Sequence, residues 1–477
     1  MKPPSPIRFF ALACLILLSP TLSPSQQTTP PPDAPKPNFF RRWASFYHDD
    51  WFPPPPTNPP APAPPAPPRR GLPSPLDSPP FPNSDWSYGG SPVLGEPDTS
   101  TYPLMTAINN AKSRTKIYGW LEPTANYSTS SNTNAPEAND VYANRFELNQ
   151  SVLYIERLPN TVQQTHPDWG FHLTALYGTD YRFTMAKGYF SHQWLGLHRQ
   201  YGFDPTLEYL DLYLPKIGQG TNIRIGRFIS VPGVEAQLAP NNYIFSHSLL
   251  YSIDPFTDTG IMATTKLNDN WLIQLGLTAG HDVAPWTPDA KPSFTACLDY
   301  TTTSVNDNWY LCANGINNAK YAYNNLQQYD ATWYHRFSKS WHLASETWYM
   351  YERDVPNIRP ADIVPIKPET GANIAHCLPS ELRCTAPEYA AASTLQKELA
   401  PHDYLSFRAD FLDDKKGQRT GYATRYSEHT LIWGHWIGST IQLRPEIRFE
   451  RAWDTKAYDQ GHHQNQLTIA SDLIYHF

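Results

Sequence analysis

The stretch Ile441-Gln-Leu-Arg-Pro-Glu-Ile-Arg-Phe-Glu450 alternates between two kinds of side chain. Its odd-numbered positions are apolar and its even-numbered positions are polar, with charges at Arg444, Glu446, Arg448 and Glu450. A period of two is that of a β-strand with two different faces. A closed core could not hold so many charges without a large desolvation cost, so we expect the charged face to meet water and the apolar face to meet lipid. The pattern therefore predicts one strand of a membrane β-barrel.

The last strand of the chain shows the same period. One of its faces carries Leu467, Ile469, Leu473, Tyr475 and Phe477, interrupted only by Ser471. Apolar residues at alternate positions before a terminal aromatic residue resemble the terminal signal of bacterial outer-membrane barrels, so we expect Phe477 to bind the barrel assembly machinery. A soluble antiparallel sheet with one solvated face would also alternate, but the terminal aromatic and the export signal described next argue against it.

The N-terminus has the features of an export signal. Two basic residues, an apolar stretch from 9 to 18 and small residues before an expected cleavage site after Ser25 predict a signal peptide over residues 1–25. Lipid attachment at Cys14 is the less favoured alternative, because the preceding residues fit a lipid-attachment box poorly. The predicted location of the mature chain is the bacterial outer membrane.

The composition of the 477 residues excludes two classes of protein. Hydrophobic residues make up 40% of the chain, its mean hydropathy is -0.52, and no window beyond the N-terminus holds the roughly 18 consecutive apolar residues of a membrane-spanning helix. A bundle of transmembrane helices is therefore excluded, and any membrane span must consist of strands. The formal net charge is -7 and the basic residues do not cluster, so nucleic acid is not expected as a partner.

Proline dominates residues 26–100. Proline lacks the backbone donor and fixes φ, so we expect neither a helix nor a strand here, but a largely disordered periplasmic linker. An aromatic island from Phe39 to Phe52 interrupts the prolines. It is either a membrane-surface or partner-docking patch or an aromatic-rich piece of linker, and the second interpretation is favoured because proline follows at once.

Residues 101–477 are predicted to form an all-β, up-and-down antiparallel transmembrane barrel of about 16 strands. Short turns alternate with long connections, as expected for a barrel with short periplasmic turns and longer outer loops. The long connections are expected at 181–205, 230–255, 354–387 and 413–424. The strand windows begin near Lys116, Phe146, Trp169, Thr206, Thr221, Phe256, Trp271, Ser293, Asp307, Leu326, Trp341, Glu388, His402, Arg425, Thr440 and Gln466.

Six strings in this region carry a resemblance to a known family. They are Lys116-Ile-Tyr-Gly-Trp120, Ile225-Gly-Arg-Phe228, Ala239-Pro-Asn-Asn-Tyr243, the stretch from Ser246 to Tyr251, Phe407-Arg-Ala-Asp-Phe-Leu-Asp-Asp414 and Leu443-Arg-Pro-Glu-Ile-Arg-Phe449. In order and spacing they resemble the OmpL-like putative beta-barrel porin family. The resemblance implies an outer-membrane, channel-forming barrel. The proline-rich segment and the cysteines depart from the family's usual pattern, so the resemblance implies nothing about the N-terminus.

The predicted function is diffusion of small hydrophilic solutes or ions through a water-filled, charge-lined lumen. The alternative is an outer-membrane anchoring or adhesion barrel with a plugged lumen. Charges of both signs along the bore would give only mild ion selectivity, although the same residues could instead form neutralised pairs that brace the wall. Six residues are expected to line the lumen: Arg408, Asp410, Arg444, Glu446, Arg448 and Glu450.

The connection 230–255 is a candidate constriction loop. It joins the fifth and sixth predicted strands, where many sixteen-stranded porins fold their third outer loop into the bore, and it includes Val231, Gly233 and Glu235. A barrel of this width without such a loop would leave an open aqueous channel. The alternative is a loop that lies on the rim.

Four cysteines follow the predicted signal peptide, in a compartment that permits disulfides. Antiparallel pairing about the turn between the eighth and ninth predicted strands would place Cys297 opposite Cys312. Cys377 and Cys384 fall together in the connection 354–387, where a local bridge would close a small ring. The alternative is four reduced thiols.

No catalytic, metal or cofactor site is predicted. Ser427-Glu428-His429 could seed a hydrolase site, but the chain contains no Gly-x-Ser-x-Gly elbow. His462-His463 lacks a clear third metal ligand nearby in the sequence. Outer-membrane lipid and small hydrophilic solutes are the expected partners, and assembly into a homo-oligomer stays open.

Overall fold

The computed structural model describes residues 37–53, 102–136, 139–161, 163–191, 200–304, 306–320, 324–338, 340–357 and 375–477. The predicted signal peptide, Cys14 and most of the proline-rich linker lie outside the described residues. Among the described helices, none is long and apolar enough to cross a membrane.

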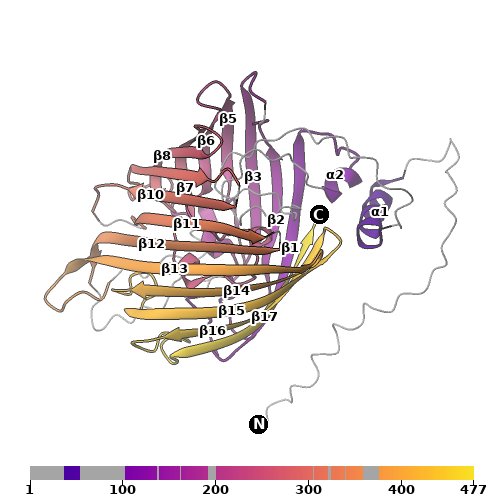
Figure 1. Ribbon diagram of the computed structural model, residues 1–477. Helices are drawn as coiled ribbons and strands as arrows, with labels where there is room; N and C mark the ends of the chain where they lie inside the picture. The colour runs from indigo at the N-terminus through magenta and orange to yellow at the C-terminus, as the bar shows by residue number, and fades with distance from the viewer. Residues whose placement is uncertain are drawn as a thin grey trace, which may run out of the picture. The chain divides into compact units, whose positions relative to one another are not determined.

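Strands dominate the described chain and form one antiparallel sheet that closes on itself, because β1 pairs with both β2 and β17 (Figure 1). Both β4 and β5 pair with β3, so these two segments make one interrupted strand and the 17 segments make 16 barrel strands. The strands are β1 (Thr115–Ser128), β2 (Phe146–Arg157), β3 (Asp168–Gly178), β4 (Gly202–Asp204), β5 (Glu208–Leu214), β6 (Thr221–Ile229), β7 (Thr257–Lys266), β8 (Trp271–His281), β9 (Ser293–Thr301), β10 (Asp307–Ile316), β11 (Gln327–Ser338), β12 (Trp341–Pro356), β13 (Arg383–Ala400), β14 (Asp403–Asp414), β15 (Thr424–Ile437), β16 (Ile441–Ala452) and β17 (Asn465–His476).

The predicted barrel is confirmed, with two differences in its strands. The fourth strand is broken between β4 and β5, where Pro205 cannot donate a ladder hydrogen bond. The twelfth strand begins at Arg383 rather than near Glu388, so Cys384 lies in β13 and not in the outer connection. The reason is that inward and outward positions keep alternating there, and β12 pairs with this extension up to Pro356.

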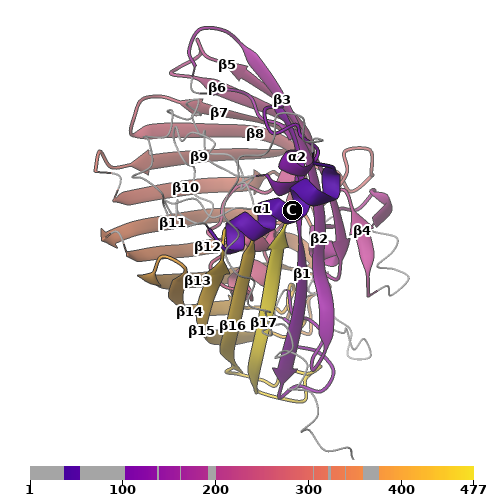
Figure 2. The same cartoon turned by 90° about the vertical axis from the view of Figure 1, so that its right-hand side faces the viewer.

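The expectation that residues 26–100 contain no helix is wrong at one place. The aromatic island forms the helix α1 (Phe39–Trp51). The physical reason is that no proline occurs between Asn38 and Phe52, so the backbone hydrogen bonds of about three helical turns are free to form. A short helix, α2 (Pro103–Ala107), precedes β1. Figure 2 shows α1 and α2 beside the C-terminus, at the end of the barrel where the short turns lie.

The two faces of the strands follow the predicted alternation. On β16, Ile447 and Phe449 are exposed on the outside, whereas Arg444 and Arg448 are buried inside. Aromatic side chains gather outside near the short turns, as in the chain of rings from Trp271 through Tyr300 to Trp309, and such a belt is typical of a barrel at a membrane interface.

Candidate channel constriction

The connection between β6 and β7 folds into the interior of the barrel. This inner loop, residues 230–256, contains the short helices η3 (Ala239–Asn241) and α5 (Leu249–Ser252). Gly233 has a φ of 128°, which favours glycine over any side chain at this bend. The loop binds side chains from strands on opposite sides of the barrel, as described next.

One side of the inner loop packs against the first strands. Leu238 and Ala239 belong to a buried cluster with Tyr118 and Trp120 of β1, and Val231 is part of the same cluster. The side chain of Gln150 on β2 donates to the carbonyl of Gln237 (2.8 Å) and accepts from the backbone N–H of Ala239 (3.2 Å). These contacts hold the loop on the β1–β2 wall.

The other side of the inner loop is held by later strands. The backbone N–H of Val234 donates to the Glu346 carboxylate on β12 (2.7 Å). On β16, Glu446 accepts from the N–H of Ser246 (3.0 Å), and on β14 Asp410 accepts from the N–H of Leu249 (2.9 Å). Apolar side chains of α5 pack in a second buried cluster that includes Leu249, Leu250, Ile253, Trp348, Met350, Leu412 and Tyr426. The loop therefore crosses the interior instead of lying on the rim.

Arg408 links the wall of the barrel to the inner loop. Its guanidinium donates to both carboxylate oxygens of Glu428 on β15 (2.9 and 3.2 Å) and to Glu235 of the inner loop (2.8 Å). It also donates to the carbonyl of Ser246 (2.7 Å). Because Arg408 is inaccessible to solvent and Glu235 is nearly so, this network ties the loop to the wall.

Arg444 makes a second tie of the same kind. Its guanidinium pairs with Asp472 on β17 (3.0 Å) and donates to the loop carbonyls of Ala239 (3.0 Å) and Asn242 (2.7 Å). Carbonyl oxygens of an irregular loop would otherwise be left unsatisfied in the interior, so this single cation serves both the strand carboxylate and the loop backbone.

All six residues expected to line the lumen point inward, but the water contact expected for them is not what the structure has. Arg448 lies 3.1 Å from Glu450 and 3.8 Å from Glu446, and like Arg408 and Arg444 it is fully buried. The alternation of β16 fixes only which face a residue occupies. In the structure, charges of opposite sign and the inner loop surround these side chains.

A small hollow of about 20 Å³ lies beside the inner loop. On one side it meets the β12–β13 wall, and on the other side it meets the middle of the loop. Its lining combines neutral polar and apolar side chains with a single carboxylate: Val234, Glu235, Asn241, Asn242, Tyr243, Ile244, Ala344 and Thr394.

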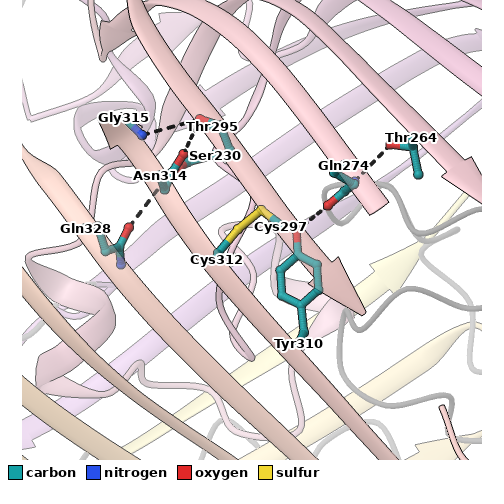
Figure 3. Close-up of a disulfide and its surroundings, with 10 residues drawn as sticks. All are labelled: Ser230, Thr264, Gln274, Thr295, Cys297, Tyr310, Cys312, Asn314, Gly315 and Gln328. Carbon is teal, nitrogen blue, oxygen red and sulfur yellow. Dashed lines mark hydrogen bonds between the residues drawn. A yellow bond between two sulfur atoms is a disulfide. The ribbon is translucent and has the colours of Figure 1, made fainter. Parts of the chain in front are cut away.

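The cysteines form two disulfides. Cys297 and Cys312 lie directly opposite each other on β9 and β10, which is the register expected for this hairpin, and they are bridged inside the barrel (Figure 3). Two residues further along β10, Asn314 donates to Ser230 at the start of the inner loop (2.9 Å). Cys377 and Cys384 are bridged at the outer end of β13.

The residues considered for other chemistry have different partners. Trp453 donates to the hydroxyl of Ser427 (3.1 Å), and the ring of His429 packs over Phe407 on the lipid-facing side. In the described chain, one group has the spacing of a metal site, Cys377 with Glu381 and Cys384, but its two sulfur atoms are joined to each other.

Sequence reasoning missed the aromatic filling of the interior near β1 and β2. The signal was present: in Ile117-Tyr-Gly-Trp-Leu121 both faces carry apolar side chains, so the strand does not alternate. A strand that is apolar on both faces is covered on both faces. Here lipid covers one face and the inner loop, with Met105 of α2, covers the other.

The model of the family described as putative beta-barrel porin-2, OmpL-like, matches residues 114–477. The chain belongs to this family. It is thus a porin-like barrel of the outer membrane, as the sequence predicted. Among curated proteins, none matches this member of the family.

Solved structures with a similar fold include three bacterial outer-membrane proteins. An anion-selective porin from Comamonas acidovorans is 11% identical (TM-score 0.49), with 76% of this chain and 99% of that chain covered. The outer membrane channel DcaP of Acinetobacter baumannii is 10% identical (TM-score 0.44; 76% and 97% covered). OmpT of Vibrio cholerae is 7% identical (TM-score 0.46; 76% and 97% covered).

Proposed function

We propose that this chain is an outer-membrane channel for small hydrophilic solutes, whose narrowest passage is the hollow between the inner loop and the β12–β13 wall. The observation that carries the proposal is the inner loop itself, which is bonded to opposite walls and leaves a hollow at its side. A loop that crosses a barrel narrows the bore and limits the size of what passes. Membership of a porin family supports the channel role.

The charges around the hollow favour a weak preference for cations. Glu235 is the one charged residue in its lining, while Arg408 and Arg444 are buried behind the loop. A carboxylate at a narrow passage attracts cations, although its ion pair with Arg408 reduces the effect. We expect Glu235→Gln to lower the cation-to-anion permeability ratio in a bi-ionic potential measurement.

Single-channel conductance in a planar bilayer tests the passage. Tyr243→Ala enlarges the hollow and should raise the conductance, whereas Thr394→Trp fills it and should lower the conductance. Tyr243→Phe is the matched control, because it changes the side-chain volume little. If correctly assembled Tyr243→Ala and Thr394→Trp barrels both conducted like the unmodified protein, the passage would not run through this hollow.

One observation favours the second candidate, an anchoring or adhesion barrel with a plugged lumen. The inner loop packs into buried clusters on both walls, which fills much of the interior. The two functions differ in the same measurement, since a plugged barrel inserted into a bilayer gives no conductance steps, even for the Tyr243→Ala variant.

A further inference from the structure

The helix α1 is seated on the rim of the barrel formed by the short turns and the C-terminus, which in barrels of this class faces the periplasm. The hydroxyl of Tyr47 donates to the carbonyl of His476 (2.8 Å), and the Tyr47 ring stacks on that of Tyr475 (centroids 5.3 Å apart). Tyr47 is buried, and this burial raises the pKa of its hydroxyl above the usual range. The helix is therefore docked on the last strand.

A second set of contacts fixes the C-terminal end of α1. The carboxylate of Asp50 accepts from the backbone N–H of Ser439 (2.9 Å) and from the hydroxyl of Thr440 (2.7 Å), in the turn between β15 and β16. The Trp51 indole donates to the same hydroxyl (2.9 Å). At Gly438 a Cβ atom would lie 2.2 Å from the Asp50 carboxylate, so this seat requires glycine in the turn.

The aromatic face of α1 extends beyond the residues that contact the barrel. Rings four residues apart contact one another in tilted pairs along the helix, from Phe39 to Trp43 (centroids 5.5 Å apart), from Trp43 to Tyr47 (5.7 Å) and from Tyr47 to Trp51 (5.4 Å). Phe40, at the edge of this face, is 78% exposed. At 100° per residue, the opposite side of the helix carries the exposed polar residues Arg41, Ser45 and Asp49.

The aromatic face continues the lipid-facing surface of the barrel. Tyr475 shares a strand face with Leu473 and Ile469, which are exposed on the outside of β17. The row of rings on α1 joins this face where Tyr47 stacks on Tyr475. Aromatic side chains are enriched at membrane–water interfaces, and a helix with an aromatic face and a polar face lies in the plane of the interface.

We propose that α1 is an interfacial anchoring helix, whose face of Phe39, Phe40, Trp43 and Phe46 binds phospholipid of the periplasmic leaflet. Its polar side then faces the periplasm. Arg42 donates to the carbonyl of Ala107 in α2 (2.7 Å), so the described residues on both flanks of the proline-rich stretch are held at the membrane surface. The proposal does not depend on whether the barrel conducts.

Quenching by spin-labelled lipid tests the proposal on the mature chain, from which the predicted signal peptide with Cys14 has been removed. The four cysteines of the barrel are disulfide-bonded, so a cysteine introduced at one position can be labelled with an environment-sensitive fluorophore. The protein carrying Phe40→Cys is reconstituted in phosphatidylethanolamine–phosphatidylglycerol vesicles that contain doxyl-labelled phosphatidylcholine. Ser45→Cys, on the polar side of the same helix, is the matched control, and Ile469→Cys marks a lipid-facing strand position.

We expect doxyl lipid to quench the label at position 40 several-fold more than at position 45, and to a degree similar to that at position 469. Quenching at position 40 by aqueous iodide instead would overturn the proposal. Protection from both quenchers would also overturn it, because a protein surface such as a second copy of this chain would then cover the face. If Phe40→Cys prevented assembly, Phe46→Cys would replace it, with the same outcomes.

Discussion

Arg408 is inaccessible to solvent and has three partners: the Glu428 carboxylate, Glu235 and the carbonyl of Ser246. Removing one member of a buried ion pair leaves an uncompensated charge, which costs far more than the pair contributes when intact. We therefore expect a single substitution in the β14–β15 wall to lower the free energy of unfolding of the whole barrel.

We predict that Arg408→Ala lowers the free energy of unfolding by about 3 to 5 kcal/mol, because Glu428 is left buried without its cation. Urea unfolding of the barrel in lipid vesicles measures the loss. Arg425→Ala is the control, since the ion pair of Arg425 with Asp454 is exposed and its loss should change the stability little. Equal losses in the two variants would contradict the account, and Arg408→Leu with Glu428→Leu should recover part of the stability.

A second prediction concerns two matching clusters on the outside near the short turns. One carboxylate oxygen of Asp403 accepts from the Trp433 indole (3.0 Å) and lies 2.8 Å from Nδ1 of His435. Asp307 makes the same contacts with Trp333 and His335. We expect Asp403→Ala to lower the thermal unfolding temperature more than Asp403→Asn, because the asparagine oxygen still accepts. Equal shifts of the unfolding temperature in the two variants would show that the hydrogen-bond acceptor at position 403 does not stabilise the cluster.

The sequence indicates which face of a strand carries the inward charges but not what surrounds them. Alternation along β16 puts Arg444 and Arg448 on one face, because the period of a strand depends only on the strand, and both side chains are buried. Their burial depends on the inner loop, which lies about two hundred positions earlier in the chain. A local sequence pattern does not indicate a contact between residues so far apart in the chain.

At the scale of elements, the hairpin of β9 and β10 gives a direct test of register. The structure pairs Cys297 with Cys312 and Cys377 with Cys384. Non-reducing peptide mapping should recover these two cross-links. A peptide joining Cys297 to Cys384 would contradict the strand pairing.

Replacing Cys297 and Cys312 with alanine should lower the free energy of unfolding by at most about 3 kcal/mol, the value for a loop of 15 residues. The loss should be smaller than this because the hydrogen-bond ladder between β9 and β10 already holds the hairpin together.

Elements were predictable where their determinants are local. The strands follow their own alternation, whereas the expected connection 181–205 ended at Pro205 and so left out β4, which precedes that proline. The helix α1 was missed because the proline content of its surroundings was given more weight than its own proline-free sequence. The contact of α1 with Tyr475 could not be inferred from the sequence of the helix, since the two segments are more than four hundred positions apart in the chain.

At the scale of the molecule, closure of the sheet explains why the interior can be both charged and apolar. The wall at β1–β2 presents aromatic side chains, the wall at β14–β16 presents ion pairs, and the inner loop supplies matching partners to each. A composition that is polar overall therefore still builds a packed interior. Lipid solvates the outside, so the outward apolar residues need no partner within the chain.

The direction of the barrel in the membrane is the last prediction. Thr455, in the connection between β16 and β17, and Lys216, in the turn between β5 and β6, are both exposed and lie at opposite ends of the strands. If the long connections face outward, a bulky maleimide reagent that cannot cross the outer membrane should label Thr455→Cys on intact cells and Lys216→Cys only after permeabilisation. The unmodified chain is the control, because its barrel cysteines are disulfide-bonded. Labelling of Lys216→Cys alone on intact cells would reverse the orientation and place α1 on the outer surface, where the proposed phospholipid contact would have to be abandoned.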